Sequence, residues 1–532
     1  MRHTVPLPET WTEASLRDIA WNLRPRSNPS EHPGLRFVGM DNVEAQTTRL
    51  LGTVPASIMK STATHFQPGD VLYGRLRPYL NKVFTAQFEG LASAEFIPLT
   101  TPAGVHPEFV KYRLNSAEFV AFTSRLDTGD RPRVDYEQIA DFRVSLPPSG
   151  EQHRIVEAIE SYLTRLDNAG ALLERVEENL KRYRASVLKA AVEGRLVPTE
   201  AELARREGRT SEPAGDLLKR ILAERKARWI EDAAEKARAK AEEKARKTGK
   251  PWTAKDNAAA LDKERAKAAK QHKEPAAPDT NGLRELPEGW CWAGPEQVSS
   301  GEQYAIGIGP FGSNLLVTDY TDSGVPLVFV RNIRAELFGT EEDHYISAEK
   351  AAELRPHWVE PGDVLITKMG EPPGDACLYP PSRRTAVITA DCIRLRLHPA
   401  AGSPKYIVYA VRSYGVRTQI AAMTKGVAQK KVSLARFKGL AIPFPPVSEQ
   451  LRLVSELDRV NAVCEAVGRE VRVNIVRGQR LRQSILKWAF EGKLVEQDPN
   501  DEPASALLER IRAERAATGA GESRARKRRG AE

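Results

Sequence analysis

The sequence predicts an α/β protein in which two α/β modules alternate with two long coiled-coil helices. Three observations support this fold class. A series of short motifs occurs twice in the same order, the segment after each module has a constant length, and that segment carries the apolar spacing of a coiled coil. With 532 residues, of which 41% are hydrophobic, the chain can form several domains with buried cores.

The internal repeat covers the start of each module and both ends of each helical segment. The paired motifs are LPETW at 7–11 and LPEGW at 286–290, PGDVL at 68–72 and 361–365, LPPSGEQHRIV at 146–156 and FPPVSEQLRLV at 444–454, SVLKAAVEGRLVP at 186–198 and SILKWAFEGKLVE at 484–496, and EPAGDLLKRILAER at 212–225 and EPASALLERIRAER at 502–515. Because their order is kept, we interpret the chain as two copies of one unit.

Between the shared motifs, the two modules differ in length and sequence. Pro8 and Gly69 are 61 positions apart, whereas Pro287 and Gly362 are 75 positions apart. Each module is expected to contain a short strand that begins at the aspartate of its Pro-Gly-Asp turn; the two strand sequences are DVLYGRL and DVLITKM. Each module ends in a basic, glycine-containing segment, at residues 128–139 and 424–437. If the modules contact DNA, these segments are the predicted contact loops.

The helical segment after each module has a fixed length. Glu151 and Gly194 are 43 positions apart, and Glu449 and Gly492 are also 43 positions apart. The two glutamates fall in the first helical turn, where a carboxylate suits the positive end of the helix dipole. The two glycines are expected to end the helices as C′ residues.

The start and the apolar seam of these helices can also be assigned. Two prolines favour an extended approach, and Ser149 with Gln152 is expected to form a capping box. The first seam is expected to pass through Val176 and Tyr183 with one 3,3 step near Ala169, and the polar Asn474 in the second seam is expected to fix helix register. The core seam positions are Ile159, Leu163, Leu166, Leu173, Leu180, Leu453, Leu457, Val460, Val467, Val471, Leu481 and Ile485.

These patterns predict six segments. They are a first module at 1–148, a first helical spacer at 149–230, a charged helical linker at 231–280, a second module at 281–446, a second helical spacer at 447–515 and a basic disordered tail at 516–532. The linker is rich in Ala, Glu, Lys and Arg without a continuous apolar stripe, so it is expected to be a solvated helical excursion.

Composition and absent motifs limit the possible functions. The net charge of +9 and the pI near 9.2 favour a polyanionic partner such as nucleic acid. The four cysteines form no CxxC pair, so we expect buried thiols in a reducing cytoplasm and no metal site. No apolar stretch approaches a membrane span of about 18 residues, so we expect a soluble protein.

Motifs for nucleotide phosphates, for amino-methyltransferases and for zinc proteases are missing. GIGPFG at 307–312 fits GxGxxG, but its proline stands where a helix would have to form, so a flexible loop is expected. We therefore expect no catalytic residue and no cofactor in this chain.

Two variable modules alternating with two repeated helices, the paired PPxxEQ starts, the paired EG[RK]LV ends and the LPExW module starts resemble the specificity (S) subunit of type I restriction-modification systems. The resemblance covers nearly the whole chain. It implies that each module is a target recognition domain and that the two helices pack antiparallel as a spacer. Such a helix pair has a pseudo-two-fold axis, so the modules are expected to meet DNA in opposite senses.

The resemblance also implies partners. The family's subunit reads a bipartite, asymmetric site on double-stranded DNA. It recruits two methylation (M) subunits, which use S-adenosylmethionine to methylate adenine at N6. It also recruits two restriction (R) subunits, which use ATP and Mg²⁺ to translocate and cut DNA. The outer faces of the two helices and the EG[RK]LV ends are the expected docking surface for the methylation subunits.

Candidate DNA contacts follow from base chemistry. Arg pairs with guanine and Asn or Gln with adenine in the major groove, while Lys and other Arg side chains hold phosphates. The candidates are Arg75, Arg77, Arg131 and Arg133 in the first module and Arg331, Asn332, Lys368, Gln429, Lys430 and Lys431 in the second. Two alternatives stay open: a repeat scaffold that binds only proteins, and a DNA-modifying enzyme with unrecognised motifs.

Overall fold

The computed structural model describes residues 7–126, 129–249, 253–333, 337–339, 344–424 and 430–529, with side chains described up to residue 517. The chain forms two compact units. One comprises Met1–Glu177 with Arg469–Glu532, and the other comprises Glu178–Gly468. Among the described residues, no helix is long and apolar enough to cross a membrane.

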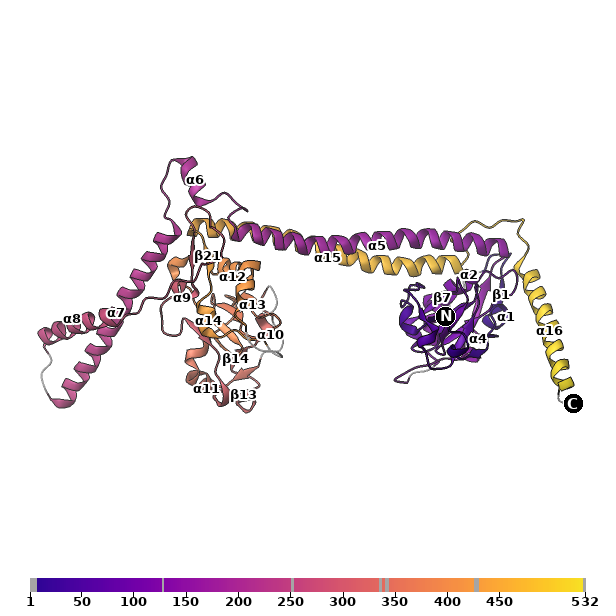
Figure 1. Cartoon of the computed structure of the whole chain (residues 1–532), viewed down its shortest axis with the longest axis horizontal. Helices are drawn as coiled ribbons and strands as arrows, with labels where there is room; N and C mark the ends of the chain where they lie inside the picture. Colours follow the sequence, from indigo (N-terminus) through magenta and orange to yellow (C-terminus); the bar gives the residue numbers. More distant parts are fainter. Residues whose placement is uncertain are drawn as a thin grey trace. The chain divides into compact units, whose positions relative to one another are not determined.

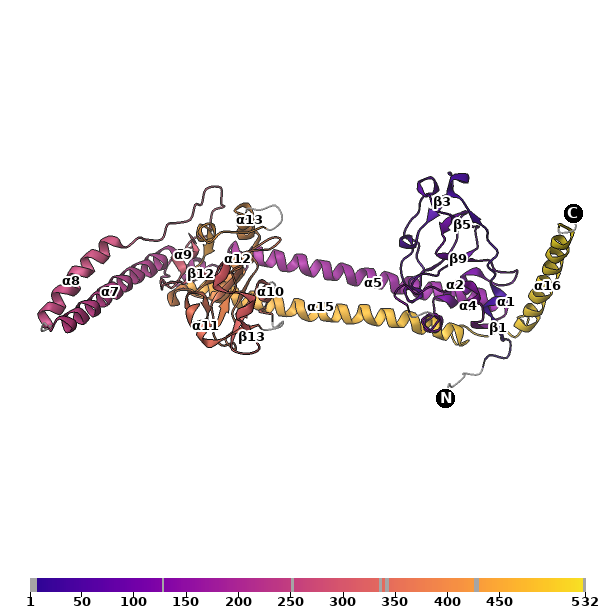
Figure 2. The same cartoon turned by 90° about the horizontal axis from the view of Figure 1, so that it is seen from below.

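The module of the first unit is built from short strands (Figure 2). A five-stranded sheet has the order β2-β5-β8-β3-β4, and a three-stranded sheet has the order β7-β6-β9. The strands are β1 (Thr12–Ser15), β2 (Arg26–Ser27), β3 (Arg36–Val38), β4 (Val54–Pro55), β5 (Ala63–Phe66), β6 (Val71–Gly74), β7 (Val83–Thr85), β8 (Gly90–Ser93), β9 (Phe96–Leu99) and β10 (Arg143–Leu146). The helices are α1 (Leu16–Ile19), α2 (Pro107–Leu114), α3 (Ala117–Thr123) and α4 (Tyr136–Ala140).

The module of the second unit has a comparable organisation. Its sheets have the orders β12-β20-β17-β18 and β13-β15-β14-β19-β16. The strands are β11 (Cys291–Ala293), β12 (Ile306–Ile308), β13 (Tyr320–Thr321), β14 (Val325–Val328), β15 (Tyr345–Ile346), β16 (Trp358–Val359), β17 (Val364–Thr367), β18 (Ala376–Leu378), β19 (Ala386–Ile388), β20 (Cys392–Leu395) and β21 (Ile442–Phe444). The helices are α9 (Pro295–Val298), α10 (Val330–Ile333), α11 (Ala348–Glu353), α12 (Pro404–Arg412), α13 (Tyr414–Ala422) and α14 (Leu434–Lys438).

The strand that follows each Pro-Gly-Asp turn is central in both modules. Successive side chains of a strand point to opposite faces. In β17, Val364 and Ile366 therefore join the core that includes the long helices, while Leu365 joins a separate core inside the module. In β6, Val71 and Leu72 divide in the same way.

In both modules, the first and last strands pair antiparallel. β1 pairs with β10 and β11 pairs with β21. Because the last strand runs directly into the long helix, this pairing brings the beginning of each module next to the beginning of its helix.

The two long helices have equal length. α5 (Ser149–Val192) and α15 (Val447–Phe490) contain 44 residues each (Figure 1). In the first unit, Ile159 near the start of α5 shares a core with Ala489 near the end of α15. In the second unit, Ala191 near the end of α5 shares a core with Leu457 near the start of α15. The helices therefore pack antiparallel, which confirms the predicted fold class of α/β modules joined to two long helices.

The inward face of α5 departs from the predicted seam after Leu166. Val176 and Tyr183 are 38% and 54% exposed. Partly buried positions continue instead at 170, 173, 177, 180 and 184, which keeps a regular alternation of three and four residues. The 3,3 step that we predicted near Ala169 is therefore wrong, because Gly170 rather than Ala169 occupies the inner face.

The middle of α15 shows the same shift. Val467 and Leu481 are 39% and 41% exposed, whereas Gly468 is buried. Asn474 is exposed and donates a hydrogen bond to the Glu470 carbonyl of its own helix at 2.9 Å, so its expected role in helix register is not supported. The other predicted seam residues are buried or partly buried: Ile159, Leu163, Leu166, Leu173, Leu180, Leu453, Leu457, Val460, Val471 and Ile485.

Each long helix is followed by another helical segment. After α5 come α6 (Glu200–Glu207), α7 (Ala214–Thr248) and α8 (Ala254–Gln271), and after α15 comes α16 (Ala504–Arg529). The equivalent residues Leu217 and Leu507 anchor the starts of α7 and α16 on the core of their units. The backbone of α16 is helical to Arg529, although disorder is predicted from residue 516.

Candidate nucleic-acid interface

Three segments of the first module meet beside the end of β6. The Arg75 N–H donates to the Glu95 carbonyl at 2.8 Å, and the Val134 N–H donates to the Arg75 carbonyl at 3.1 Å. The Arg77 N–H donates to the Pro132 carbonyl at 2.8 Å. The backbone thus fixes the basic segment before α4 against two segments that lie far from it in sequence.

The second module forms the same junction beside the end of β17. The Lys368 N–H donates to the Asp391 carbonyl at 2.8 Å, and the Val432 N–H donates to the Lys368 carbonyl at 3.0 Å. The Gly370 N–H donates to the Lys430 carbonyl at 3.3 Å. Two modules of different length therefore place their predicted contact loops through equivalent backbone hydrogen bonds. We call these two places the loop junctions.

The loop junction of the first module presents exposed guanidinium groups. Arg77, Arg131 and Arg133 are exposed, whereas Arg75 is partly buried. Arg133 forms a bidentate ion pair with Glu95, with N–O distances of 2.9 and 3.2 Å, and this pairing raises the pKa of the Arg133 guanidinium. The structure thus brings the four predicted arginines of this module together, and three of them are exposed to solvent.

The loop junction of the second module presents Lys430 and Lys431, which are both exposed. The Lys431 ammonium lies 3.6 Å from the carboxylate of Asp391, the residue equivalent to Glu95. Lys368 is only 9% exposed and donates to the Ala390 carbonyl at 3.2 Å, and burial lowers the pKa of its ammonium group. Lys368 therefore supports the loop from inside.

The remaining candidates of the second module behave differently from one another. Arg331 is exposed and its guanidinium lies 4.4 Å from the ring centroid of Phe329. Asn332 is 2% exposed; its amide oxygen accepts from the Phe329 N–H at 2.8 Å and its amide nitrogen donates to the Gly339 carbonyl at 3.2 Å. The Asn332 amide thus holds its own loop, and its predicted contact with DNA stays a prediction. Gln429 lies outside the described residues.

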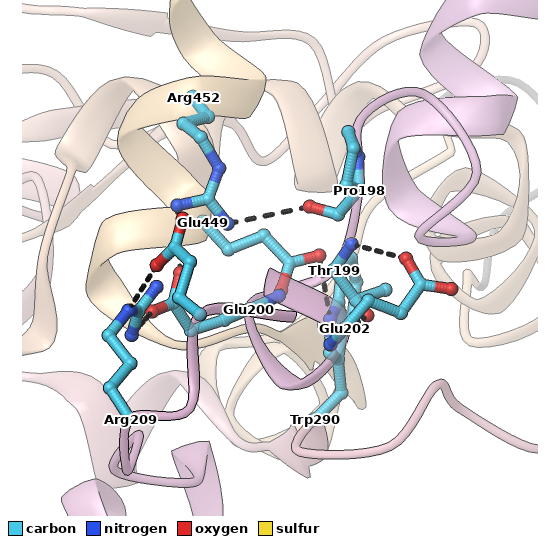
Figure 3. Close-up of polar contacts among 9 residues, drawn as sticks. Pro198, Thr199, Glu200, Glu202, Arg209, Trp290, Glu449 and Arg452 are labelled. Carbon is cyan, nitrogen blue, oxygen red and sulfur yellow. Dashed lines mark hydrogen bonds and ion pairs between the residues drawn. The ribbon is translucent and has the colours of Figure 1, made fainter. Parts of the chain in front are cut away.

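The start of each long helix contains a buried carboxylate that joins several segments. The Trp11 indole donates to one Glu151 oxygen at 2.9 Å, and the Gln497 amide donates to the other at 2.6 Å. In the second unit, the Trp290 indole donates to Glu449 at 3.0 Å, and the Glu200 N–H donates to its other oxygen at 2.8 Å (Figure 3). Burial raises the pKa of both glutamates.

The glutamine after each of these glutamates fixes the module to the same helix. The Gln152 amide oxygen accepts from the His106 N–H at 2.8 Å, and its amide nitrogen donates to the Pro147 carbonyl at 3.0 Å. The Gln450 amide makes the equivalent bonds to the Ser403 N–H and the Pro445 carbonyl. The predicted capping box of Gln152 with Ser149 is therefore wrong, because the module uses this amide.

Comparison with curated proteins gives relatives of one kind. The specificity subunit of the type I restriction enzyme EcoBI from Escherichia coli is 25% identical over 397 residues, which cover 72% of this chain and 66% of that protein, just under two thirds of its length. The EcoKI specificity subunit from Escherichia coli strain K12 is 24% identical over 552 residues, covering 96% of this chain and 97% of that protein. No family model matches the chain.

This chain is similar to type I restriction enzyme specificity subunits. Solved structures agree on the fold. The HsdS subunit from Thermoanaerobacter tengcongensis superposes with a TM-score of 0.52 at 18% identity and covers 92% of this chain and 99% of that chain. A chain from a structure of type I R-M complex assembly and conformational transition gives a TM-score of 0.63 at 17% identity, with the same coverage.

The fold contains two buried residues, Glu151 and Glu449, whose contacts were not predicted from the sequence. The sequence led us to explain both glutamates by a favourable interaction with the helix dipole. In the structure, each accepts a hydrogen bond from the tryptophan of its own LPExW motif. The sequence contains a pattern that could have predicted this contact, because LPExW and PPxxEQ occur together in both copies. Among the described residues, no group of three or more His, Cys, Asp or Glu side chains could hold a metal ion.

Proposed function

We propose that this chain is the DNA sequence-specificity subunit of a type I restriction-modification complex and that it reads a bipartite, asymmetric site with its two modules. The observation that carries this proposal is the pair of loop junctions. Two modules with different sequences use the same backbone contacts to present exposed cationic side chains. Conserved scaffolding under variable contact residues is what two independent readers of different half-sites require.

The exposed side chains at the junctions have the chemistry for this task. Arg77 and Arg131 carry planar guanidinium groups, which can pair with guanine or hold phosphates. Lys430 is a point charge suited to phosphate. Arg133 and Lys431 are held by Glu95 and Asp391, so they reach DNA with their carboxylate partner beside them. Such a carboxylate can accept a hydrogen bond from cytosine N4.

The proposed partners are double-stranded DNA, two methylation subunits and two restriction subunits, all in the cytoplasm. In this proposal, methylation of adenine with S-adenosylmethionine and ATP-driven, Mg²⁺-dependent cutting occur on the partner subunits, and this chain supplies the address. The polar faces of α5 and α15 and the segments that follow them are the proposed docking surface for the methylation subunits.

The specificity-subunit function is supported over the two alternatives. The sequence matches are to specificity subunits, and two of the solved structures share their fold with this chain over 92% of its length. A protein-binding scaffold would not need cationic loops presented in the same way by both modules. A DNA-modifying enzyme would modify DNA as an isolated chain supplied with Mg²⁺ or S-adenosylmethionine, which is a simple control.

The proposal is tested by mapping N6-methyladenine in host DNA after co-expression with the cognate methylation subunit. A split motif is expected. Arg131→Ala should relax or abolish recognition of one half only, and Lys430→Ala should affect only the other half. Arg143→Ala is the matched control, because this arginine is also exposed and lies in the first module but on β10, paired with Glu13. A contiguous motif, or a single substitution that changes both halves, would contradict the proposal.

A further inference from the structure

The helices α7 and α8 form a hairpin that the proposed function leaves without a role (Figure 1). The beginning of α7 is docked on the second module. Leu217 and Ile221 are buried there, and the Arg225 guanidinium donates to the Gln297 carbonyl at 3.2 Å. From residue 231 onward, α7 packs against α8, and this outer part is the distal hairpin, residues 231–249 and 253–271. In the part of the chain that the structure describes after α15, residues 491–529, a single helix α16 occupies the equivalent place.

The distal hairpin has almost no apolar core. Its helices meet through alanines, of which Ala234 and Ala268 are buried, and the ion pair of Arg265 with Glu231 at 2.7 Å connects them. Within the described part of the distal hairpin, no large apolar side chain is exposed. A protein interface normally has an apolar or aromatic centre, and the described residues 231–249 and 253–271 expose none. Any partner of the distal hairpin would therefore be bound mainly through its charged side chains.

Positive charges predominate on this surface. Within the described residues of the distal hairpin, Asp262, Glu264 and Glu243 pair with cations of the same helix. The cations that form no ion pair among the described residues are Lys236, Arg238, Lys240, Lys244, Arg246, Lys255, Lys263 and Lys270, and the acids in the same position are Asp232, Glu235, Glu242 and Asp256. The hairpin is thus left with an excess of unneutralised positive charge.

The lysines are also arranged in a row. Lys236, Lys240, Lys244 and Lys247 follow each other at intervals of four, four and three residues, so they share one face of α7. At 1.5 Å per residue, this row is about 16 Å long. Duplex DNA carries about one negative charge per 1.7 Å of its axis, so a straight cationic row of this length matches several phosphates.

We propose that the distal hairpin binds the phosphate backbone of duplex DNA that flanks the site read by the second module. This inference rests on the proposed function, since it adds a sequence-independent contact to a sequence-specific one. The hairpin contributes affinity and salt dependence without changing the recognised sequence, because phosphate contacts carry no base information. The other macromolecule to consider, an acidic protein surface, is distinguished by the experiment.

The test replaces the four lysines of the row by glutamine in the full chain, assembled with its methylation subunits. Glutamine removes the charge and keeps helix propensity. The matched control replaces the same four lysines by arginine, which keeps the charge. Binding is measured as a function of salt on a duplex that contains the site mapped by methylation, with flanks of about one helical turn or with flanks trimmed away; this turn corresponds to roughly 34 Å.

Lys236, Lys240 and Lys244 form no ion pair among the described residues, whereas Lys247 already pairs with Glu243 at 2.7 Å. Three lost phosphate contacts should therefore reduce the slope of log affinity against log salt by about 2.7. Across a fourfold rise in salt, the wild-type complex should therefore lose about 40-fold more affinity than the glutamine variant on the long duplex. The arginine variant should match wild type, and trimming the flank beside the second module should remove the difference. The methylated sequence should stay the same in every variant.

An unchanged salt slope for the glutamine variant on the long duplex would overturn the inference. So would a glutamine variant that keeps this slope but loses a methylation or restriction subunit, because the partner would then be a protein. Failure of the wild-type complex to bind the mapped site in preference to random duplex would instead contradict the proposed function. The two failures are therefore distinguishable in one set of titrations.

Discussion

Replacing Gly194 by alanine tests the contact between the end of α5 and the second module. Gly194 has a φ of +67°, and a Cβ atom built there would lie 2.4 Å from Cγ of Pro287 and 3.4 Å from the indole of Trp290. Gly208 is the matched control. Its φ is +64°, and nothing lies within 4 Å of the position of its Cβ. The two alanine variants therefore share the backbone penalty and differ in the steric clash.

The magnitudes follow from these two observations. A left-handed conformation costs a non-glycine residue roughly 1–2 kcal/mol, so Gly208→Ala should reduce the free energy of unfolding by about that amount. Overpacking against a fixed proline ring adds about 1–3 kcal/mol. Gly194→Ala should therefore destabilise the second unit by roughly 2–5 kcal/mol, of which the difference between the variants is the cost of the clash.

Hydrogen exchange measured by mass spectrometry is the suitable assay, because it assigns opening free energies to segments rather than to the whole chain. Peptides from Glu178–Gly468, the second unit, should lose protection in Gly194→Ala more than in Gly208→Ala. Equal loss in both variants would refute the reasoning, since it would mean that the Pro287 ring yields without cost.

Three further predictions concern the loops and the buried carboxylates. Trp290→Phe removes the indole donor to Glu449 and should reduce the free energy of unfolding of the second unit by about 1.5–3 kcal/mol in a urea titration. A free energy of unfolding equal to that of the unmodified protein would show that this hydrogen bond does not stabilise the fold. Because burial raises the pKa of Glu449, the folded state binds more protons than the unfolded state. The free energy of unfolding should therefore fall as pH rises from the pKa of the unfolded state, near 4.5, through the raised pKa of the folded state. Glu449→Gln should reduce this pH dependence in thermal melts, and an unchanged pH dependence would show that Glu449 is not its source. Glu95→Gln removes the ion pair with Arg133 and should change stability by less than about 1 kcal/mol while altering the methylated sequence in one half-site only.

The sequence was sufficient to place the long helices but not their contacts. Two prolines before residue 149 and a glycine at 194 bracket the observed helix Ser149–Val192 closely, because both are local signals. The inward face depends on the partner helix, so the apolar Val176 and Tyr183 were assigned to a seam that they do not occupy. Periodicity identifies a helix that packs, and the packing itself decides which of two neighbouring rows turns inward.

At the loop junctions, too, the sequence predicted the location of the loops but not the role of each side chain. Glycines and basic residues before the long helices were enough to predict which loops gather cations, and Arg131 and Lys430 are indeed exposed there. Asn332 has the right chemistry for adenine, yet its amide caps the backbone of its own loop. Sequence cannot separate these cases, because an Asn side chain serves a backbone turn and a base edge with the same donor and acceptor.

The repeated motifs attach each module to its long helix, so they are kept while the contact residues of the modules differ. Side chains that fix the start of a module to the start of its long helix come from motifs present in both copies, namely the tryptophan of LPExW and the Glu-Gln pair of PPxxEQ. The other bonds to these two glutamines, from the His106 and Ser403 N–H groups, come from the module backbone and do not depend on a module side chain. A module can therefore change its length and its contact residues without altering its attachment. Exchanging residues 7–146 with residues 286–444 should then keep every one of these bonds. If the modules are independent readers, the exchange should transfer each half-site with its module.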